Sequence, residues 1–281
     1  MTIVDCAGMP LDLSRPKVMG ILNVTPDSFS DGGDFIAPGK AIYHAEQMLR
    51  AGASIIDVGG ESTRPGAAAV SEQEEMDRVI PVIEAIKQRL PVIVSIDTNK
   101  PAVMRAAVAA GAGLINDVMA LQAPEAIATA QQLNVPICLM HMQGEPRTMQ
   151  HNPVYADVVP DVLNFFEQRI EACVAGGIPR ERLLLDPGFG FGKTLEHNLT
   201  LLKYLGEFMH IGLPLLVGVS RKSMIGAILD EATVDDRLYG SLAAAVLALE
   251  KGAAIIRVHD VKPTVDALRV VNAVRYGTNG L

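Results

Sequence analysis

The sequence has few of the features that bind nucleic acids. Trp is absent, aromatic residues make up only 4% of the chain, and 24 Lys and Arg face 32 Asp and Glu, for a formal net charge of −8. The basic residues are scattered along the chain and form no run. Nucleic-acid binding needs a basic footprint, and binding of single strands also needs aromatic stacking surfaces. We therefore expect no nucleic-acid partner, and a phosphorylated substrate would need a local basic site.

Cysteines and long apolar runs are also scarce. The three cysteines, Cys6, Cys138 and Cys173, are odd in number and lack the spacing of zinc ligands, which predicts reduced thiols. No apolar run approaches the roughly 18 residues that cross a bilayer. The first residues lack the basic start and apolar stretch of a signal peptide. We therefore expect no membrane partner and a cytoplasmic location.

Short apolar runs alternate with helical patterns along the whole chain. The runs span residues 17–23, 52–57, 91–97, 111–116, 136–141, 183–186, 214–220 and 252–257. The helical patterns span 38–51, 72–89, 100–110, 123–133, 156–175, 196–208, 222–251 with an interruption, and 261–276. Near-continuous apolar runs are typical of parallel strands that are covered on both faces. The alternation predicts an α/β fold, a single (β/α)8 TIM barrel domain over residues 1–281, with a doubly wound open sheet as the alternative.

Every one of these runs ends on a polar residue. The strand ends are Asn23, Asp57, Asp97, Asn116, His141, Asp186, Ser220 and Arg257. Asn, Asp and Ser are common at strand ends as turn formers and helix caps, which would explain any one of them. Active sites of these barrels lie at the C-terminal ends of the strands, and a set with several carboxylates, a His and an Arg favours one shared site there.

A glycine-rich segment, DPGFGFGKT, follows the run that ends at Asp186. It has one residue too few between its glycines for a P-loop, and its G-x-G-x-G spacing is not the dinucleotide fingerprint. We interpret it as a flexible loop that presents Phe189 and Phe191 to an aromatic ligand.

Two further segments suit an anion. Lys222 and its neighbour Arg221 stand where a helix opens, which favours anions, although both could be ordinary surface residues. Arg257 and His259 lie on the same side of an extended segment and suit a phosphate or pyrophosphate.

Asn23, before a long polar loop, is a candidate oxygen ligand for Mg²⁺, which typically takes one or two protein groups and phosphate oxygens.

Taken together, the motifs MGILNVTPDSFSDGG, DVGGESTRPG, SIDT, IND, MHMQG, DPGFGFGKT, GVSRKS and RVHDV resemble the dihydropteroate synthase family of the folate pathway. The resemblance runs from Lys17 almost to the end of the chain. It implies a (β/α)8 barrel, commonly a homodimer. It also implies a transferase that joins 6-hydroxymethyl-7,8-dihydropterin pyrophosphate to p-aminobenzoate, releases pyrophosphate with Mg²⁺ and is the target of sulfonamides.

The resemblance also assigns residues to three parts of the site. The pterin side falls on Asp97, Asn116, Met140, Asp186, Lys222 and Arg257. The pyrophosphate side falls on Asn23, through the metal, with Arg257 and His259. The p-aminobenzoate side falls on Phe29, Thr63, Arg64, Pro65, Phe191 and Ser220. The implied mechanism is dissociative and uses no side-chain nucleophile: Asp97 and Asp186 stabilise a cationic pterin, and Lys222, Arg257 and His259 complete the catalytic set.

Two other functions stay open at this point. A pterin-binding methyltransferase of the same fold would share the Asp97, Asn116 and Asp186 pocket but would not need the STRPG and SRKS loops. A non-catalytic pterin carrier would have no use for an anion site at Arg257 and His259.

Overall fold

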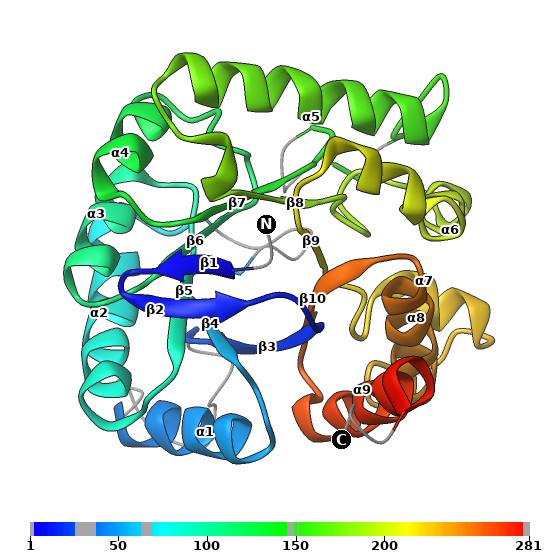
Figure 1. The fold of residues 1–281 in the computed structure, drawn as a ribbon, viewed down its shortest axis with the longest axis horizontal. Helices are drawn as coiled ribbons and strands as arrows, with labels where there is room; N and C mark the ends of the chain where they lie inside the picture. The colour runs from blue at the N-terminus through cyan, green and yellow to red at the C-terminus, as the bar shows by residue number, and fades with distance from the viewer. Residues whose placement is uncertain (1–2, 26–37, 63–68, 145–148, 151, 278–281) are drawn as a thin grey trace.

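A closed parallel barrel forms the centre of the molecule (Figure 1). The computed structural model describes residues 3–25, 38–62, 69–144, 149–150 and 152–277. The barrel strands are β3 (Lys17–Asn23), β4 (Ile55–Gly59), β5 (Ile93–Asp97), β6 (Leu114–Asp117), β7 (Ile137–Met140), β8 (Leu183–Asp186), β9 (Leu215–Val217) and β10 (Ala253–Val258). Each strand pairs in parallel with the next, and β10 closes the ring onto β3. The predicted (β/α)8 barrel is therefore confirmed, and the open-sheet alternative is wrong.

Helices fill the connections between strands and surround the barrel. They are α1 (Pro38–Arg50), α2 (Glu72–Arg89), α3 (Pro101–Ala109), α4 (Ala126–Leu133), α5 (Val158–Ala175), α6 (Leu195–Lys203), α7 (Ser223–Ile228), α8 (Leu238–Glu250) and α9 (Val261–Tyr276). The helix expected over 196–208 ends at Lys203 and continues as a 3-10 helix, Leu205–Ile211. The interruption in 222–251 is real, because a 3-10 turn at Asp235–Arg237 separates α7 from α8.

The core has two layers, because each strand is covered on both faces. One cluster of buried apolar side chains lies between the barrel and the helices, with Phe166 and Phe208 among its largest members. The other lies inside the barrel and takes one residue from nearly every strand, such as Ile55, Ile93 and Leu184. This inner layer fills the lower part of the barrel, so a ligand can enter only above it.

An N-terminal hairpin that the sequence analysis did not predict closes the lower end of the barrel. Strands β1 (Ile3–Cys6) and β2 (Met9–Asp12) pair antiparallel across a turn at Ala7 and Gly8, both of which have positive φ. Val4, Cys6 and Leu11 join the inner cluster, and Figure 1 shows the hairpin lying across the near face of the barrel. With this end covered, the site is restricted to the C-terminal ends of the strands.

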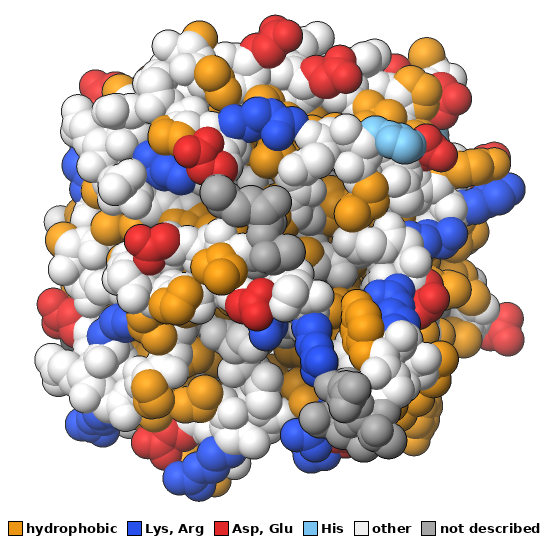
Figure 2. Space-filling model, in the orientation of Figure 1, with side chains coloured by type: hydrophobic (Ala, Val, Ile, Leu, Met, Phe, Trp, Pro, Cys, Tyr) orange, Lys and Arg blue, Asp and Glu red, His pale blue; other side chains and the backbone are white. Residues whose placement is uncertain are grey.

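Two predictions from composition can be compared with the structure. Cys6, Cys138 and Cys173 are buried and form no disulfide, as expected. On the face that Figure 2 shows, acidic and basic side chains are interspersed, in line with the absence of a basic run in the sequence. Within the described residues, no helix combines the length and the apolar character needed to cross a membrane.

Candidate active site

The strand register places several of the predicted site residues side by side. Asn23 is aligned with Gly59, Gly59 with Asp97, and Asp97 with Asn116 across four adjacent strands. Met140 is aligned with Asp186 on β7 and β8. Because aligned positions of parallel strands point to the same side of the sheet, these side chains face the barrel interior near the C-terminal ends of their strands.

Arg257 lies at the centre of a hydrogen-bonded network inside this mouth. Its Nε donates to Asp57 Oδ2 at 2.6 Å, and its Nη2 donates to Asp97 Oδ2 at 2.6 Å. Asn116 Nδ2 donates to the same Asp57 oxygen at 3.1 Å. The guanidinium therefore fixes the two carboxylates of β4 and β5 relative to each other. Asp57 appeared among the polar strand ends but was not assigned to the site, although its side chain is fully buried there.

Burial strongly affects the ionisation of the two pterin-side carboxyls. It raises the pKa of Asp97 to about 7, although the nearby Arg257 charge acts in the opposite direction. Burial also raises the pKa of Asp186, whose Oδ1 accepts a hydrogen bond from the Gly188 amide at 2.8 Å. Carboxyls with raised pKa values at the mouth of a barrel are typical of functional sites, because each can change protonation when a ligand binds.

Two acceptor atoms at the mouth lack a hydrogen-bond partner within the described part of the chain. They are Asp57 Oδ1 and Asn116 Oδ1, both fully shielded from solvent. A buried acceptor without a donor costs about 1–3 kcal/mol, so such atoms in a cleft are suited to donors on a ligand. The donors they need are N–H groups, which a guanidine-like ring edge provides.

Lys222 lies at the N-terminal end of α7, near enough to Asp186 for their charges to interact. Its ammonium lies 4.2 Å from the centre of the Phe191 ring, a cation–π contact. Burial lowers its pKa to about 8, and the Arg257 charge acts in the same direction. The preceding residue, Arg221, has a left-handed backbone (φ 56°) and makes a bidentate ion pair with Asp260 at 2.7 and 2.9 Å. Arg221 thus holds the turn that carries Lys222 rather than facing solvent freely.

Arg257 and His259, which were predicted to bind an anion, carry less positive charge than an Arg and a protonated His would. Burial and the Arg257 charge lower the pKa of His259 to about 4, so the imidazole is neutral near pH 7. Its Nδ1 lies 3.1 Å from Ser220 Oγ, and its backbone N–H donates to the same hydroxyl. Arg257 is already paired with two aspartates. The assignment of pyrophosphate to this pair stays a prediction, with His259 as a neutral hydrogen-bonding group.

The loop after β8 was predicted to present both Phe189 and Phe191 to a ligand, and the structure agrees with this for only one of them. Phe189 is buried in the outer core, so the prediction that it faces a ligand is wrong, whereas Phe191 lies at the mouth against Lys222. Gly188 has φ of +69°, and a Cβ atom there would lie 1.9 Å from the His141 carbonyl oxygen. Glycine is therefore required where this loop passes β7.

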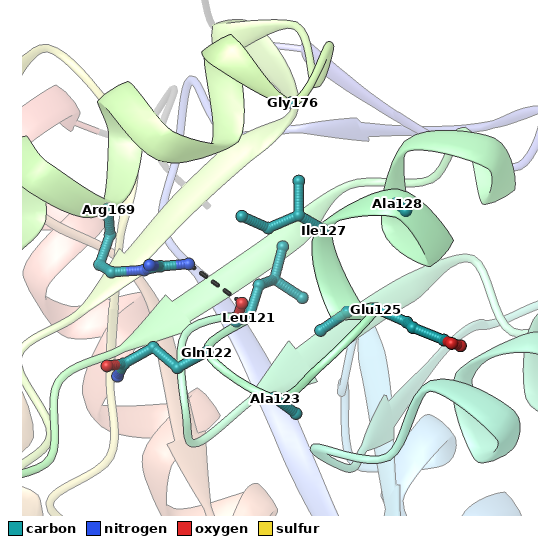
Figure 3. A pocket seen from close by; sticks show the side chains of 9 residues that line it. Leu121, Gln122, Ala123, Glu125, Ile127, Ala128, Arg169 and Gly176 are labelled. Carbon is teal, nitrogen blue, oxygen red and sulfur yellow. Dashed lines mark hydrogen bonds between the residues drawn. The ribbon is translucent and has the colours of Figure 1, made fainter.

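Four of the assigned residues cannot be placed. Phe29, Thr63, Arg64 and Pro65, all from the p-aminobenzoate side, lie outside the described residues. A separate pocket of about 570 Å³ lies between α4 and α5, on the outside of the barrel. Figure 3 shows Arg169 of α5 reaching across it to the backbone of Leu121. No residue assigned to the site lines this pocket, so the candidate site is the barrel mouth.

Comparisons with known proteins agree with this geometry. A family model described as pterin binding enzyme matches residues 19–259. The dihydropteroate synthase of Escherichia coli K12 is 59% identical over 266 residues, which covers 95% of this chain and 94% of that protein.

Two crystal structures share the fold closely. The Yersinia pestis dihydropteroate synthase, solved with a sulfonamide drug complex, has a TM-score of 0.93 at 57% identity and covers 97% of this chain and 99% of its own. The Xanthomonas albilineans dihydropteroate synthase, solved with 4-aminobenzoic acid, has a TM-score of 0.93 at 50% identity and covers 98% of each chain. With a barrel mouth built for a donor-rich ring and full-length relatives of this identity, the chain belongs to the dihydropteroate synthase family of pterin-binding enzymes.

Proposed function

We propose that the barrel mouth joins 6-hydroxymethyl-7,8-dihydropterin pyrophosphate to p-aminobenzoate, giving 7,8-dihydropteroate and pyrophosphate. The chain is a transferase of the dihydropteroate synthase family, and the curated relatives and solved structures above carry that name. The main support for placing the pterin at this mouth is the set of buried acceptor atoms there, because a pterin has an edge of N–H donors that matches them.

The pterin is held on the β4, β5, β6 and β8 side of the mouth. Asn116 Oδ1 and Asp57 Oδ1 are two of the buried acceptors without partners among the described residues, and Asp97 and Asp186 add carboxylates at the ends of β5 and β8. A pterin ring has the N–H donors that these oxygens need. Binding of the ring would then remove the cost of leaving buried acceptors unpaired, so part of the affinity comes from acceptors that no described group of the chain satisfies.

The p-aminobenzoate side is proposed for Phe191 and Ser220 together with the loops that carry Phe29, Thr63, Arg64 and Pro65. Phe191 and Lys222 form one surface at the mouth, and Lys222, which is assigned to the pterin side, joins this surface to Asp186. An aromatic ring combined with a cation suits a benzoate, which has an aromatic ring and a negative charge.

A Mg²⁺ ion bound by Asn23 is part of the proposal. Asn23 Oδ1 is the kind of oxygen ligand that a hard cation takes, and it lies beside Gly59 together with Asp97 Oδ2: each is 3.7 Å from the point where a Cβ on Gly59 would stand. Among the described residues, no cluster of three or more His, Cys, Asp or Glu could hold an ion alone. Asn23 would therefore share the metal with phosphate oxygens, the usual arrangement for Mg²⁺, and the ion would stabilise the charge of pyrophosphate.

The chain's own groups account for the proposed dissociative chemistry. As the bond to pyrophosphate lengthens, positive charge develops on the pterin, and Asp97 and Asp186 lie where their negative charge stabilises it. The Arg257 guanidinium, which donates to Asp97 at 2.6 Å, favours the ionised carboxylate against the larger effect of burial. His259, neutral and tied to Ser220, offers hydrogen bonds to the leaving group without adding charge. The amine of p-aminobenzoate then attacks, and no side chain needs to form a covalent intermediate.

We also propose that the chain is a cytoplasmic homodimer. Helices α8 and α9 expose large apolar side chains, including Tyr239 (80%), Val270 (65%) and Val274 (82%). Exposed apolar residues gathered on neighbouring helices favour a protein interface. Light scattering after size-exclusion chromatography should give twice the chain mass, and Val274→Asp should lower it. Reduced, buried cysteines fit the proposed cytoplasmic location.

One assay separates the three functions considered. With both substrates and Mg²⁺, the chain should release pyrophosphate and form dihydropteroate in equal amounts. A methyltransferase would instead need a methylated folate and a corrinoid acceptor, and a carrier would bind the pterin without turnover. Pterin binding without pyrophosphate release in the complete mixture would overturn the proposed reaction.

A further inference from the structure

The Gly-Lys-Thr end of the loop after β8 resembles a phosphate-binding motif, but its lysine faces inward. Lys193 is only 3% exposed and has no ion pair with a carboxylate among the described residues. Thr194 is the N-cap of α6 and accepts a hydrogen bond from the His197 amide. Buried lysines without an ionic partner are uncommon, because removing the charge from water is costly. We therefore expect the Lys193 amine to make contacts that an apolar side chain could not make.

Lys193 is fully occupied by three acceptors from two elements. Its Nζ lies 2.8 Å from His141 Nδ1, 2.9 Å from the Gly188 carbonyl oxygen and 3.0 Å from the Phe191 carbonyl oxygen. Burial and the Lys193 charge lower the pKa of His141 to about 2, so its ring is neutral and Nδ1 can accept. Burial lowers the pKa of Lys193 to about 7, and its protonated form has three N–H donors, one for each of these three nearest acceptors. The His141 carbonyl oxygen is a fourth acceptor at 3.4 Å. Lys193 thus ties both ends of the 188–191 turn to the end of β7.

Other side chains hold the same loop from its remaining sides. Asn198 Oδ1 accepts from the Gly190 amide at 2.7 Å, and the Tyr155 hydroxyl donates to the Gly192 carbonyl at 2.8 Å. Gln150 donates to the Gly190 carbonyl. The loop therefore has few free backbone groups, and Lys193 is the charged centre of its support.

The part of the loop that reaches the mouth is Phe191. Its ring contacts the Lys222 ammonium, and the carbonyl of the same residue is one of the three acceptors of Lys193. We infer that Lys193 is a positioning residue for p-aminobenzoate, which it serves by holding the Gly188–Gly192 loop so that Phe191 lies against Lys222. The inference depends on the proposed function and on the assignment of Phe191 to that substrate. Lys193 itself does not contact either substrate.

The test compares Lys193→Met with a matched variant elsewhere. Lys193→Met keeps the length of the side chain and removes its three donors. Arg182→Met is the control, because Arg182 is also a cation that binds backbone carbonyls, those of Ala130 and Val135, but it lies at the opposite end of the strands. Both variants should lower the melting temperature, but only Lys193→Met should change the KM for p-aminobenzoate.

The expected result is a difference between the two substrates. Lys193→Met should raise the KM for p-aminobenzoate about fivefold to tenfold, the size of an aromatic contact, and leave the KM for pterin pyrophosphate within about twofold. In a double-mutant cycle, adding Phe191→Leu should cause little further loss, because both changes remove the same surface. Equal increases in both KM values, the same pattern in Arg182→Met, or additive effects would overturn the inference.

A milder variant covers the case in which Lys193→Met does not fold. Tyr155→Phe removes only the hydrogen bond to the Gly192 carbonyl, and it should raise the KM for p-aminobenzoate about twofold to threefold, as expected for one neutral hydrogen bond. An unchanged KM in this variant would also count against the inference. Failure of the proposed function looks different, because the unmodified chain would then form no dihydropteroate from both substrates.

Discussion

The role of Asp97 can be tested by removing its charge while keeping its shape. Asp97→Asn replaces one carboxylate oxygen with an amide nitrogen, in a side chain that accepts a hydrogen bond from Arg257 at 2.6 Å. Hydrogen bonds to charged groups contribute about 1.5–3 kcal/mol, and each 1.4 kcal/mol is tenfold, so the Kd for the pterin should rise about tenfold to a hundredfold. The assay is calorimetric titration of the chain with the pterin.

The pH dependence of binding gives this prediction a second, independent readout. Burial raises the pKa of Asp97 to about 7, so the carboxylate that binds the pterin is lost as the pH falls through that value. The affinity of the unmodified chain should then fall about tenfold per pH unit below the pKa. Asp97→Asn cannot titrate, so its affinity should show only the pH dependence that the pterin itself contributes. The same pH slope in both proteins would refute the role of the carboxylate.

Folding should survive this substitution. Folding raises the pKa of Asp97, so ionising it at neutral pH opposes the folded state, and stability from this group falls as the pH rises toward 7. Arg257 keeps its hydrogen bond to Asp57 in the variant.

Asp117→Asn is the matched control: this buried carboxyl caps the Met119 and Leu121 amides instead of facing the mouth. It should lower the melting temperature and leave the Kd within about threefold, the loss from one weak contact. Unchanged pterin binding with a lower melting temperature in Asp97→Asn would make Asp97 a structural residue.

Three further predictions concern the metal, the loop after β8 and Lys222. Asn23→Ala should raise the Mg²⁺ concentration that gives half-maximal pyrophosphate release about tenfold, as expected for the loss of one contact to a charge. Full activity of the unmodified chain in excess chelator would contradict the proposal that the reaction needs a metal ion. Gly188→Ala should lower the melting temperature by about 4 °C or more, from roughly 2 kcal/mol of left-handed strain and contact with His141. Gly212→Ala, with positive φ but open space, is its control and should lose less. Lys222→Met should raise the KM for pterin pyrophosphate, the substrate to which Lys222 is assigned, and, through its contact with Phe191, the KM for p-aminobenzoate. Unchanged KM values in the same release assay would count against both roles.

Most of the barrel could be predicted, because its signals are local. Apolar runs of strand length that end on polar residues show both where a strand lies and which end faces the site. The N-terminal hairpin was missed because Ala7 and Gly8 form its turn in a segment where Pro10 interrupts the alternation. A two-residue turn ending in Gly between short apolar stretches was the available signal.

The contacts inside the site were less predictable, since they depend on which side chains meet across the barrel. Asp57 and Asp97 come from different strands and share Arg257, which lies 200 and 160 residues away in the sequence. Lys193 looked like part of a failed phosphate loop, and only its three internal acceptors identify it as a buried support. Phe189 and Phe191 differ by two positions, yet the left-handed glycines between β8 and α6 turn one into the core and the other to the mouth.

The central claim is that the pterin binds at the barrel mouth through groups that are unsatisfied without it. A crystal structure of the chain with the pterin bound tests this most directly. We expect the donor edge of the ring within hydrogen-bond distance of Asn116 Oδ1 and the carboxylates of Asp97 and Asp186, with Phe191 on the open side. A pterin bound in the outer pocket between α4 and α5, or at the mouth with its donor edge turned away from these oxygens, would contradict it.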